Sequence, residues 1–385
     1  MLTDGALRML TLLYFHKLGY GPLNLASLFL FYEFFGIVTN LFGGWLAQRF
    51  GLKLTLLGGL FLQALALFSL SFLDQTWAPS LAVPFVLLTQ GLSGIAKDLT
   101  KMSSKTAIKF LIPEDQNSKL FKWVSILTGS KNAIKGAGFF VGAFLLETLG
   151  FVDALYLMSG SIASIFIFSL ISLPAEIGQK KSKNKLKELF QQGRNINLLA
   201  AARVFLFAAR DIWFVVAVPI FLASHFKWDF SQVGTFMATW VILYGFVQAM
   251  APKILKFKSR GEAPCGAVAS LLAFSLTASM LLIFLLNFFN VSVFYSIVGG
   301  LYLFGAIFAL NSSVHSFLIL DYADGNKAAM NVGFYYMANA VGRLIGTLLS
   351  GLLYQWGSLA LCLFGSLVSL FICSIITWRL PRDKA

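Results

Sequence analysis

Long apolar runs dominate the chain, and short stretches rich in glycine, proline and charged residues separate them. A helix needs about 20 mostly apolar residues to cross the hydrocarbon core of a bilayer. On that criterion the pattern predicts an all-α membrane protein with twelve transmembrane helices. The predicted spans are 1–16, 24–47, 54–73, 81–104, 123–146, 153–173, 198–223, 231–251, 264–287, 292–319, 329–349 and 358–378.

The composition agrees with repeated membrane crossing. Hydrophobic residues make up 58% of the chain and charged residues 12%, whereas a soluble domain carries about 25% charged residues. The three cysteines and three histidines are dispersed, so the sequence predicts no metal centre, no cofactor and no disulfide framework. Since no nucleophile–base pair is recognisable either, we expect the protein not to be an enzyme.

The basic residues between the predicted helices are distributed very unevenly. Twenty of them fall in alternate loops and the C-terminal tail, whereas the opposite loops hold only Lys17 and Lys227. The positive-inside rule places the twenty in the cytoplasm. We therefore expect both termini to be cytoplasmic, in the inner (plasma) membrane of a bacterium.

The chain repeats weakly with an offset of about 207 residues. Asp4 aligns with Asp211, and the stretch 132–150 aligns with 339–357. Two six-helix halves with a substrate site near the midplane are typical of major-facilitator transporters. In this alignment helix 1 has about ten fewer residues before its aspartate than helix 7 has, so we expect helix 1 to be shortened at its N-terminus.

The repeat predicts two pseudo-symmetric six-helix bundles, at 1–173 and 198–385. The segment 174–197 between them contains the basic run KKSKNKLKEL at 180–189. We interpret this segment as a cytoplasmic linker. Binding of nucleic acid by the basic run is the less favoured alternative, because the charge asymmetry is already explained by membrane orientation.

The predicted spans themselves carry eight basic residues but only four acidic residues. An ionised side chain at the centre of a membrane helix costs about 2.5–3.5 kcal/mol on insertion scales. Ion pairing alone would give a closer balance of charge, so the excess favours an anionic ligand. The candidate substrate-binding residues are Arg8, Lys97, Lys101, Lys131, Lys135, Arg203, Arg210 and Arg343.

The spacing of these cations places several of them on shared helix faces. Lys97 and Lys101 are four residues apart, as are Lys131 and Lys135, so each pair lies along one face of a helix. Such faces would present cations to phosphate or carboxylate groups. Lys101 also lies near the cytoplasmic end of its span, where an alternative interpretation is that it extends to the membrane surface.

The four acidic residues are candidates for ion coupling or charge pairing: Asp4, Glu33, Asp98 and Asp211. Asp98 and Asp211 each adjoin a cation, so we expect them to be its partners. The Asp4–Asp211 match is compatible with a helix pairing kept in both halves. Glu33 has no basic neighbour one turn away, so it either cycles a proton or, as we slightly favour, forms a salt bridge to another helix.

The loop GGWLAQRFGLK after the second predicted helix resembles the cytoplasmic signature G-x-x-x-D-R-x-G-R-K of the major facilitator superfamily. Gln48 and Leu52 replace an Asp and an Arg of the signature, which calls into question the family's charge relay at this loop. The resemblance implies a cytoplasmic gating loop formed by the four matching positions, Gly44, Arg49, Gly51 and Lys53.

Longer strings such as LTDGALRML, GLSGIAKDLTKMSSK and RVFLFAARDIWFVVAVPIFLAS are similar to the organoarsenical-efflux (ArsJ-type) branch of that superfamily, and the similarity covers nearly the whole chain. The resemblance implies export of 1-arseno-3-phosphoglycerate and resistance to arsenate. It also implies a functional partner, the glyceraldehyde-3-phosphate dehydrogenase that makes this compound when arsenate replaces phosphate.

Two other functions stay open at this point. One is transport of another organic anion or a sugar phosphate. The other is a membrane sensor that does not transport, or a channel.

Overall fold

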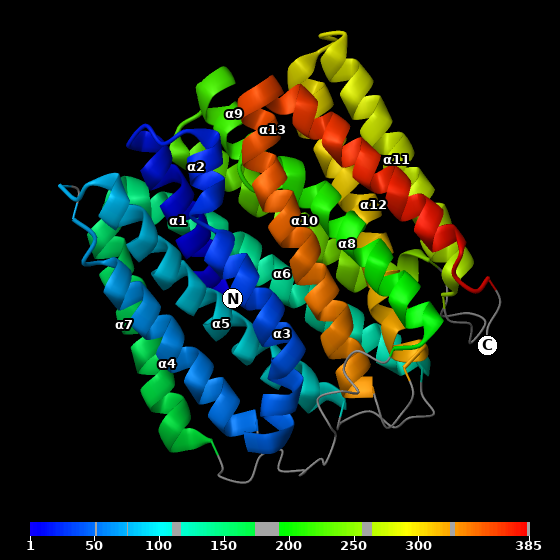
Figure 1. Ribbon diagram of the computed structural model, residues 1–385, viewed down its shortest axis with the longest axis horizontal. Coiled ribbons are helices and arrows are strands. Elements are labelled where there is room, and N and C mark those ends of the chain that lie inside the picture. The colour runs from blue at the N-terminus through cyan, green and yellow to red at the C-terminus, as the bar shows by residue number, and fades with distance from the viewer. Residues whose placement is uncertain are drawn as a thin grey trace.

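The computed structural model describes residues 1–50, 52–74, 76–109, 117–173, 192–255, 264–323 and 328–382. Within these ranges the regular elements are α-helices (Figure 1). The N-terminal part contains α1 (Leu2–Lys17), α2 (Pro22–Ser27), α3 (Leu30–Phe50), α4 (Leu52–Leu70), α5 (Pro79–Lys109), α6 (Asn117–Thr148) and α7 (Phe151–Ser172). The C-terminal part contains α8 (Arg194–Phe214), α9 (Ala217–His225), α10 (Phe230–Ile254), α11 (Gly266–Phe288), α12 (Val293–Asp321) and α13 (Ala328–Trp378).

The helices follow the predicted spans in chain order, but two spans predicted as single helices are each divided. The first divides between α2 and α3, where the turn tightens and Phe29 N donates to the Ala26 carbonyl three residues back. The second divides between α8 and α9, because Pro219 has no N–H to donate to the carbonyl four residues before it. There the Ser350 hydroxyl accepts hydrogen bonds from the N–H groups of Val216 and Ala217.

Helix α8 begins at Arg194, inside the segment 174–197 predicted as the linker, and residues 174–191 lie outside the described residues, so the linker limits stay a prediction. One predicted helix end is wrong. The span predicted to end at 349 continues until Gly357 and Ser358 leave helical geometry and reverse the chain. Gly351 lies in this continuation and lets α2 pack directly against it, with the Pro22 carbonyl oxygen 2.7 Å from where a Cβ would lie. In Figure 1 the red second half of α13 runs back beside α11.

Nine segments of the described chain are long and apolar enough to cross a membrane. One of them, Asn331–Trp378, contains the reversal at Gly357 and Ser358. Helices α1 and α6 are not among the nine, so the twelve crossings stay a prediction. Many apolar side chains on the outer faces are exposed, including Phe168 and Ile171 of α7, as expected for surfaces that contact lipid.

The helices pack as two groups that meet along two long contacts. In the N-terminal group α1 packs on α6 and α4 packs on both α5 and α7, whereas in the C-terminal group α8 and α11 pack on α13 and α10 on α12. Between the groups α6 lies along α10, and α3 lies along α13. The α6–α10 contact is close because a Cβ at Gly129 would lie 2.3 Å from the Gly245 carbonyl oxygen. The bundle limits at 173 and 198 are proposed on this pattern.

Buried aromatic side chains fill the C-terminal group just beside the space between the two groups. Trp213 and Trp240 meet edge to face with ring centroids 5.4 Å apart, and both are fully buried. The Trp240 indole nitrogen donates to the Leu301 carbonyl oxygen at 2.7 Å, so its polar atom is satisfied. This packing holds α8, α10 and α12 together around the site described next.

Candidate functional site

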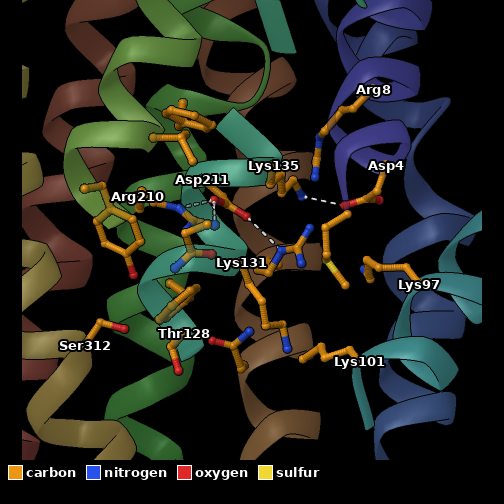
Figure 2. A pocket seen from close by; sticks show the side chains of 18 of the residues that line it. Asp4, Arg8, Lys97, Lys101, Thr128, Lys131, Lys135, Arg210, Asp211 and Ser312 are labelled. Carbon is orange, nitrogen blue, oxygen red and sulfur yellow. Dashed lines mark hydrogen bonds and ion pairs between the residues drawn. The ribbon is translucent and has the colours of Figure 1, made fainter. Parts of the chain in front are cut away.

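A cavity of about 150 Å³ lies between the two helix groups (Figure 2). All eight basic residues predicted to bind substrate line it, and so do two of the four acidic candidates, Asp4 and Asp211. The sequence interpretation therefore selected side chains that converge on one space. The neutral lining residues are Met1, Thr128, Asn132, Phe139, Phe207, Phe214, Val215, Trp240, Val241, Tyr244, Ser312, Ser316, Tyr336 and Asn339.

Asp4 connects α1 to two other helices. Its carboxylate pairs with the Lys135 ammonium of α6 at 3.1 Å and accepts a hydrogen bond from the Tyr32 hydroxyl of α3. Asp4 is buried, so these contacts compensate a charge that would otherwise be costly inside the membrane.

Asp98 pairs with two lysines on its own helix, α5. Its carboxylate oxygens lie 3.6 Å from the Lys97 ammonium and 3.2 Å from the Lys101 ammonium. Asp98 thus lies within pairing distance of both neighbouring lysines, which is the arrangement expected for a charge partner, and its own side chain does not line the cavity. Lys101 also donates to the Asn40 side-chain oxygen at 3.1 Å and lies 4.8 Å from the Tyr336 ring centroid. These contacts favour the cavity interpretation of Lys101 over extension to the membrane surface.

Glu33 is 1% exposed and forms salt bridges to two other helices. Its Oε1 lies 3.1 Å from Arg8 Nη1 of α1 and 2.6 Å from Arg343 Nη2 of α13. These contacts favour the salt-bridge interpretation of Glu33 over proton cycling. Arg343 also faces Asp211 at 3.5 Å, so a single guanidinium connects a carboxylate of the N-terminal group to one of the C-terminal group.

Asp211 pairs with Arg210 at 2.5 Å as well as facing Arg343. The contact between Asp211 and Arg343 joins α8 to α13, just as that between Asp4 and Lys135 joins α1 to α6. Lys135 aligns in the repeat with the residue before Arg343. The two aspartates therefore make related helix pairings in both halves, which the repeat had suggested.

Two of the eight cavity cations, Lys131 and Arg203, have no carboxylate partner among the described residues. Arg203 donates to the Asn339 side-chain oxygen at 3.0 Å and to the Ser312 hydroxyl at 3.1 Å. Its guanidinium carbon lies 4.0 Å from the Phe207 ring centroid. The Lys131 ammonium nitrogen is buried and has no hydrogen-bond partner in the described part of the chain.

Sequence reasoning missed the neutral polar residues that organise these charges. Asn132 donates to the Gln248 side-chain oxygen at 2.7 Å across the α6–α10 contact, and Asn339 accepts from Arg203. Asn132 and Asn339 align in the repeat, which is the signal that could have found them.

The predicted gating loop is only partly described. Gly51 lies outside the described residues, and Gly44 and Arg49 fall within α3 at positions whose side chains are also outside them. The Lys53 ammonium donates to the Leu173 carbonyl oxygen at 2.5 Å, which ties the start of α4 to the end of α7.

Comparison with known proteins identifies the fold family. The sequence pattern of the Major Facilitator Superfamily matches residues 3–256. A "Na(+), Li(+), K(+)/H(+) antiporter" of Planococcus maritimus is 27% identical over 184 residues. That match takes in 45% of this chain and only 42% of the relative.

Solved structures share the fold across nearly the whole chain. A bacterial homologue of the iron transporter ferroportin, in an outward-facing state, has a TM-score of 0.71 at 14% identity and covers 98% of this chain and 96% of its own. A D-xylose–proton symporter has a TM-score of 0.72 at 12% identity, with 100% and 94% covered. The human organic anion transporter MFSD10 (TETRAN) has a TM-score of 0.65 at 16% identity, with 91% and 83% covered. The chain therefore belongs to the major facilitator superfamily, as a multi-pass membrane transporter and not an enzyme.

Proposed function

We propose that this major facilitator exports a small organic anion that carries more than one negative charge. The observation that carries the proposal is the cavity lining, to which eight cations but only two carboxylates contribute. Cations that converge in a space of low dielectric repel one another, and a bound anion removes that cost. The family resemblance of the sequence then makes 1-arseno-3-phosphoglycerate the expected substrate.

The ion pairs support alternating access around this cavity. Arg343 contacts Glu33 in one helix group and Asp211 in the other, so it contributes to how the groups are held together. An anion that binds Arg343 competes with those carboxylates and changes the contact between the groups. Because only interactions that differ between two states can shift their populations, this competition is a direct way for substrate to drive reorientation.

Cation transport, the activity for which the Planococcus relative is named, is less compatible with the cavity. An alkali cation would enter a space already lined by eight basic groups, and like charges at about 4 Å repel by about 4 kcal/mol at an effective dielectric constant of 20. Another organic anion or a sugar phosphate fits the same lining and is the second candidate. Membership of a transporter family leaves no support for the sensor or channel alternative.

Arsenate tolerance of an arsenic-sensitive bacterium tests the proposed substrate. The transporter is expressed with and without a glyceraldehyde-3-phosphate dehydrogenase, its functional partner, and cell-associated arsenic is measured in parallel. We expect tolerance and lowered cell arsenic only when both proteins are present. Absence of protection by a membrane-inserted transporter would redirect the proposal to the second candidate.

Variants connect the activity to the cavity. Replacing Lys97, Lys131, Lys135 or Arg210 singly by Gln should lower export while the protein still reaches the membrane. Lys122→Gln, at an exposed position of α6, is the matched control and should export normally. Unchanged export by all four cavity variants would refute the assignment of the site. A reporter fused to each terminus tests the proposed cytoplasmic location of both ends, in the bacterial inner membrane.

A further inference from the structure

Two ammonium groups point toward each other in one part of the cavity. Figure 2 shows Lys131 of α6 extending toward Lys101 of α5, in the region of Thr128 and away from Lys135 and Asp211. Both side chains line the same cavity. Convergence of two like charges from different helices is unfavourable unless something negative lies between them.

The protein itself supplies too little negative charge at this place. No carboxylate pairs with Lys131 among the described residues, and Asp98 of α5 already pairs with Lys97 at 3.6 Å and Lys101 at 3.2 Å. Lys131 keeps a buried ammonium nitrogen with no hydrogen-bond partner among the described residues. A buried charge without a partner is strongly destabilising, so its presence points to a ligand that is part of the working protein.

The other part of the cavity differs because its cations are already compensated. Lys135 pairs with Asp4 at 3.1 Å, and Arg210 and Arg343 face Asp211 at 2.5 and 3.5 Å. Of the two cavity cations without a carboxylate partner among the described residues, Arg203 donates to Asn339 and Ser312, whereas the Lys131 ammonium has no hydrogen-bond partner. Asn132, which follows Lys131 on α6, also lines the cavity, with its amide nitrogen donating to Gln248.

We propose that Lys131 and Lys101 form a clamp for a dianionic phosphoryl or arsenoyl group at one end of the substrate. The second anionic group of the same molecule binds among Lys135, Arg210 and Arg343. This inference rests on the proposed function and specifies its substrate class: a short molecule with two separated anionic groups, of which at least one is a phosphoryl or arsenoyl dianion. Lys131 is the residue that discriminates the dianionic end, because ammonium groups bind phosphate oxygens as compact point charges.

Three related probes separate the two ends: glycerate, glycerol 3-phosphate and 3-phosphoglycerate. Their affinities for the full chain, purified in detergent, are measured by calorimetry for the wild type, Lys131→Gln, Lys131→Arg and the control Lys122→Gln. We expect Lys131→Gln to weaken both phosphorylated probes by about 10- to 100-fold, the range of one charged hydrogen bond, and glycerate by less than about threefold. Lys131→Arg should restore most of the phosphate affinity.

The melting temperature of the protein without ligand distinguishes a ligand-binding lysine from a purely structural one. Lys131→Gln removes an unpartnered buried charge and should leave this temperature unchanged or raised, whereas Lys135→Gln leaves Asp4 without its cation and should lower it. A fall as large as that of Lys135→Gln would show that Lys131 is structural and overturn the clamp.

The binding outcomes distinguish failure of the clamp from failure of the proposed function. If the wild type binds the phosphorylated probes and Lys131→Gln binds them with unchanged affinity, the clamp is overturned. The same holds if Lys131→Gln weakens the binding of all three probes equally. Either result leaves the proposed anion transport in place. Failure of the wild type to bind any of the three overturns both.

Discussion

Replacing Glu33 by Gln tests whether the ion pair between the helix groups contributes to stability. One carboxylate oxygen of Glu33 forms salt bridges with the Arg8 guanidinium at 3.1 Å and with the Arg343 guanidinium at 2.6 Å. At an effective dielectric constant of 20 these distances correspond to attractions of about 5 and about 6 kcal/mol. Desolvation of the three charges offsets most of this, and removing one partner of a buried ion pair costs about 3–5 kcal/mol in practice.

The loss should fall mainly on Arg8. Arg343 keeps Asp211 at 3.5 Å, whereas Arg8 has no other carboxylate among the described residues. Glu33→Gln keeps the side-chain volume and one acceptor oxygen. We therefore expect a loss of stability near the lower end of that range, about 3 kcal/mol. Adding Arg8→Gln to Glu33→Gln removes the guanidinium that has lost its partner. The loss of stability in the double variant should therefore be smaller than the sum of the two single losses by about 1–3 kcal/mol.

The assay is thermal unfolding of the purified protein in detergent, at one fixed scan rate because membrane proteins commonly unfold irreversibly. A loss of about 3 kcal/mol in a chain of this size corresponds to a fall in melting temperature on the order of 5 °C. The matched control is Asp153→Asn, an exposed carboxylate in the first turn of α7, for which about 0.3–1 kcal/mol is expected. A Glu33→Gln protein that melts like this control, or a strictly additive double variant, would refute the reasoning.

Three further variants test packing and hydrogen bonding. Gly142→Ala would place a Cβ 2.1 Å from a backbone oxygen of α1 and should lower the melting temperature. The control Gly160→Ala has nothing within 4 Å of its Cβ and should not lower it. Equal melting temperatures of the two variants would contradict the close α1–α6 contact. Arg203→Lys loses the planar fork that reaches two acceptors and should reduce export roughly tenfold in vesicles, while Arg194→Lys at the exposed start of α8 should export normally. Trp240→Phe removes one indole hydrogen bond and should cost about 1 kcal/mol in thermal unfolding; a cost of 3 kcal/mol or more would mean that the ring packing dominates.

The positions of the helices were predictable because they depend on local pattern. A run of about 20 apolar residues has one low-energy state in a bilayer, which is a helix whose backbone hydrogen bonds are satisfied within the segment. The breaks within those helices were less visible. The division before Ala217 needs Pro219 together with the Ser350 hydroxyl from a distant helix, and the sequence shows only the first of these.

The candidate site was predictable as a set of residues and not as a set of partners. Charged residues inside membrane spans are costly and therefore conspicuous in a sequence, and adjacency alone assigned Asp98 to its neighbouring lysines. Glu33 had no visible partner, because Arg343 lies 310 residues away along the chain. Sequence distance carries no information about such a contact.

The sequence by itself thus determined that the chain crosses a membrane many times and that its helices hold an excess of positive charge. Only the tertiary structure decided which of those charges are neutralised. Asp4, Glu33, Asp98 and Asp211 compensate six of the eight cations, and Lys131 and Arg203 keep no carboxylate partner among the described residues. The physical reason is that insertion into a bilayer depends on the composition of each segment, whereas electrostatic interaction depends on distances that exist only after the helices have packed.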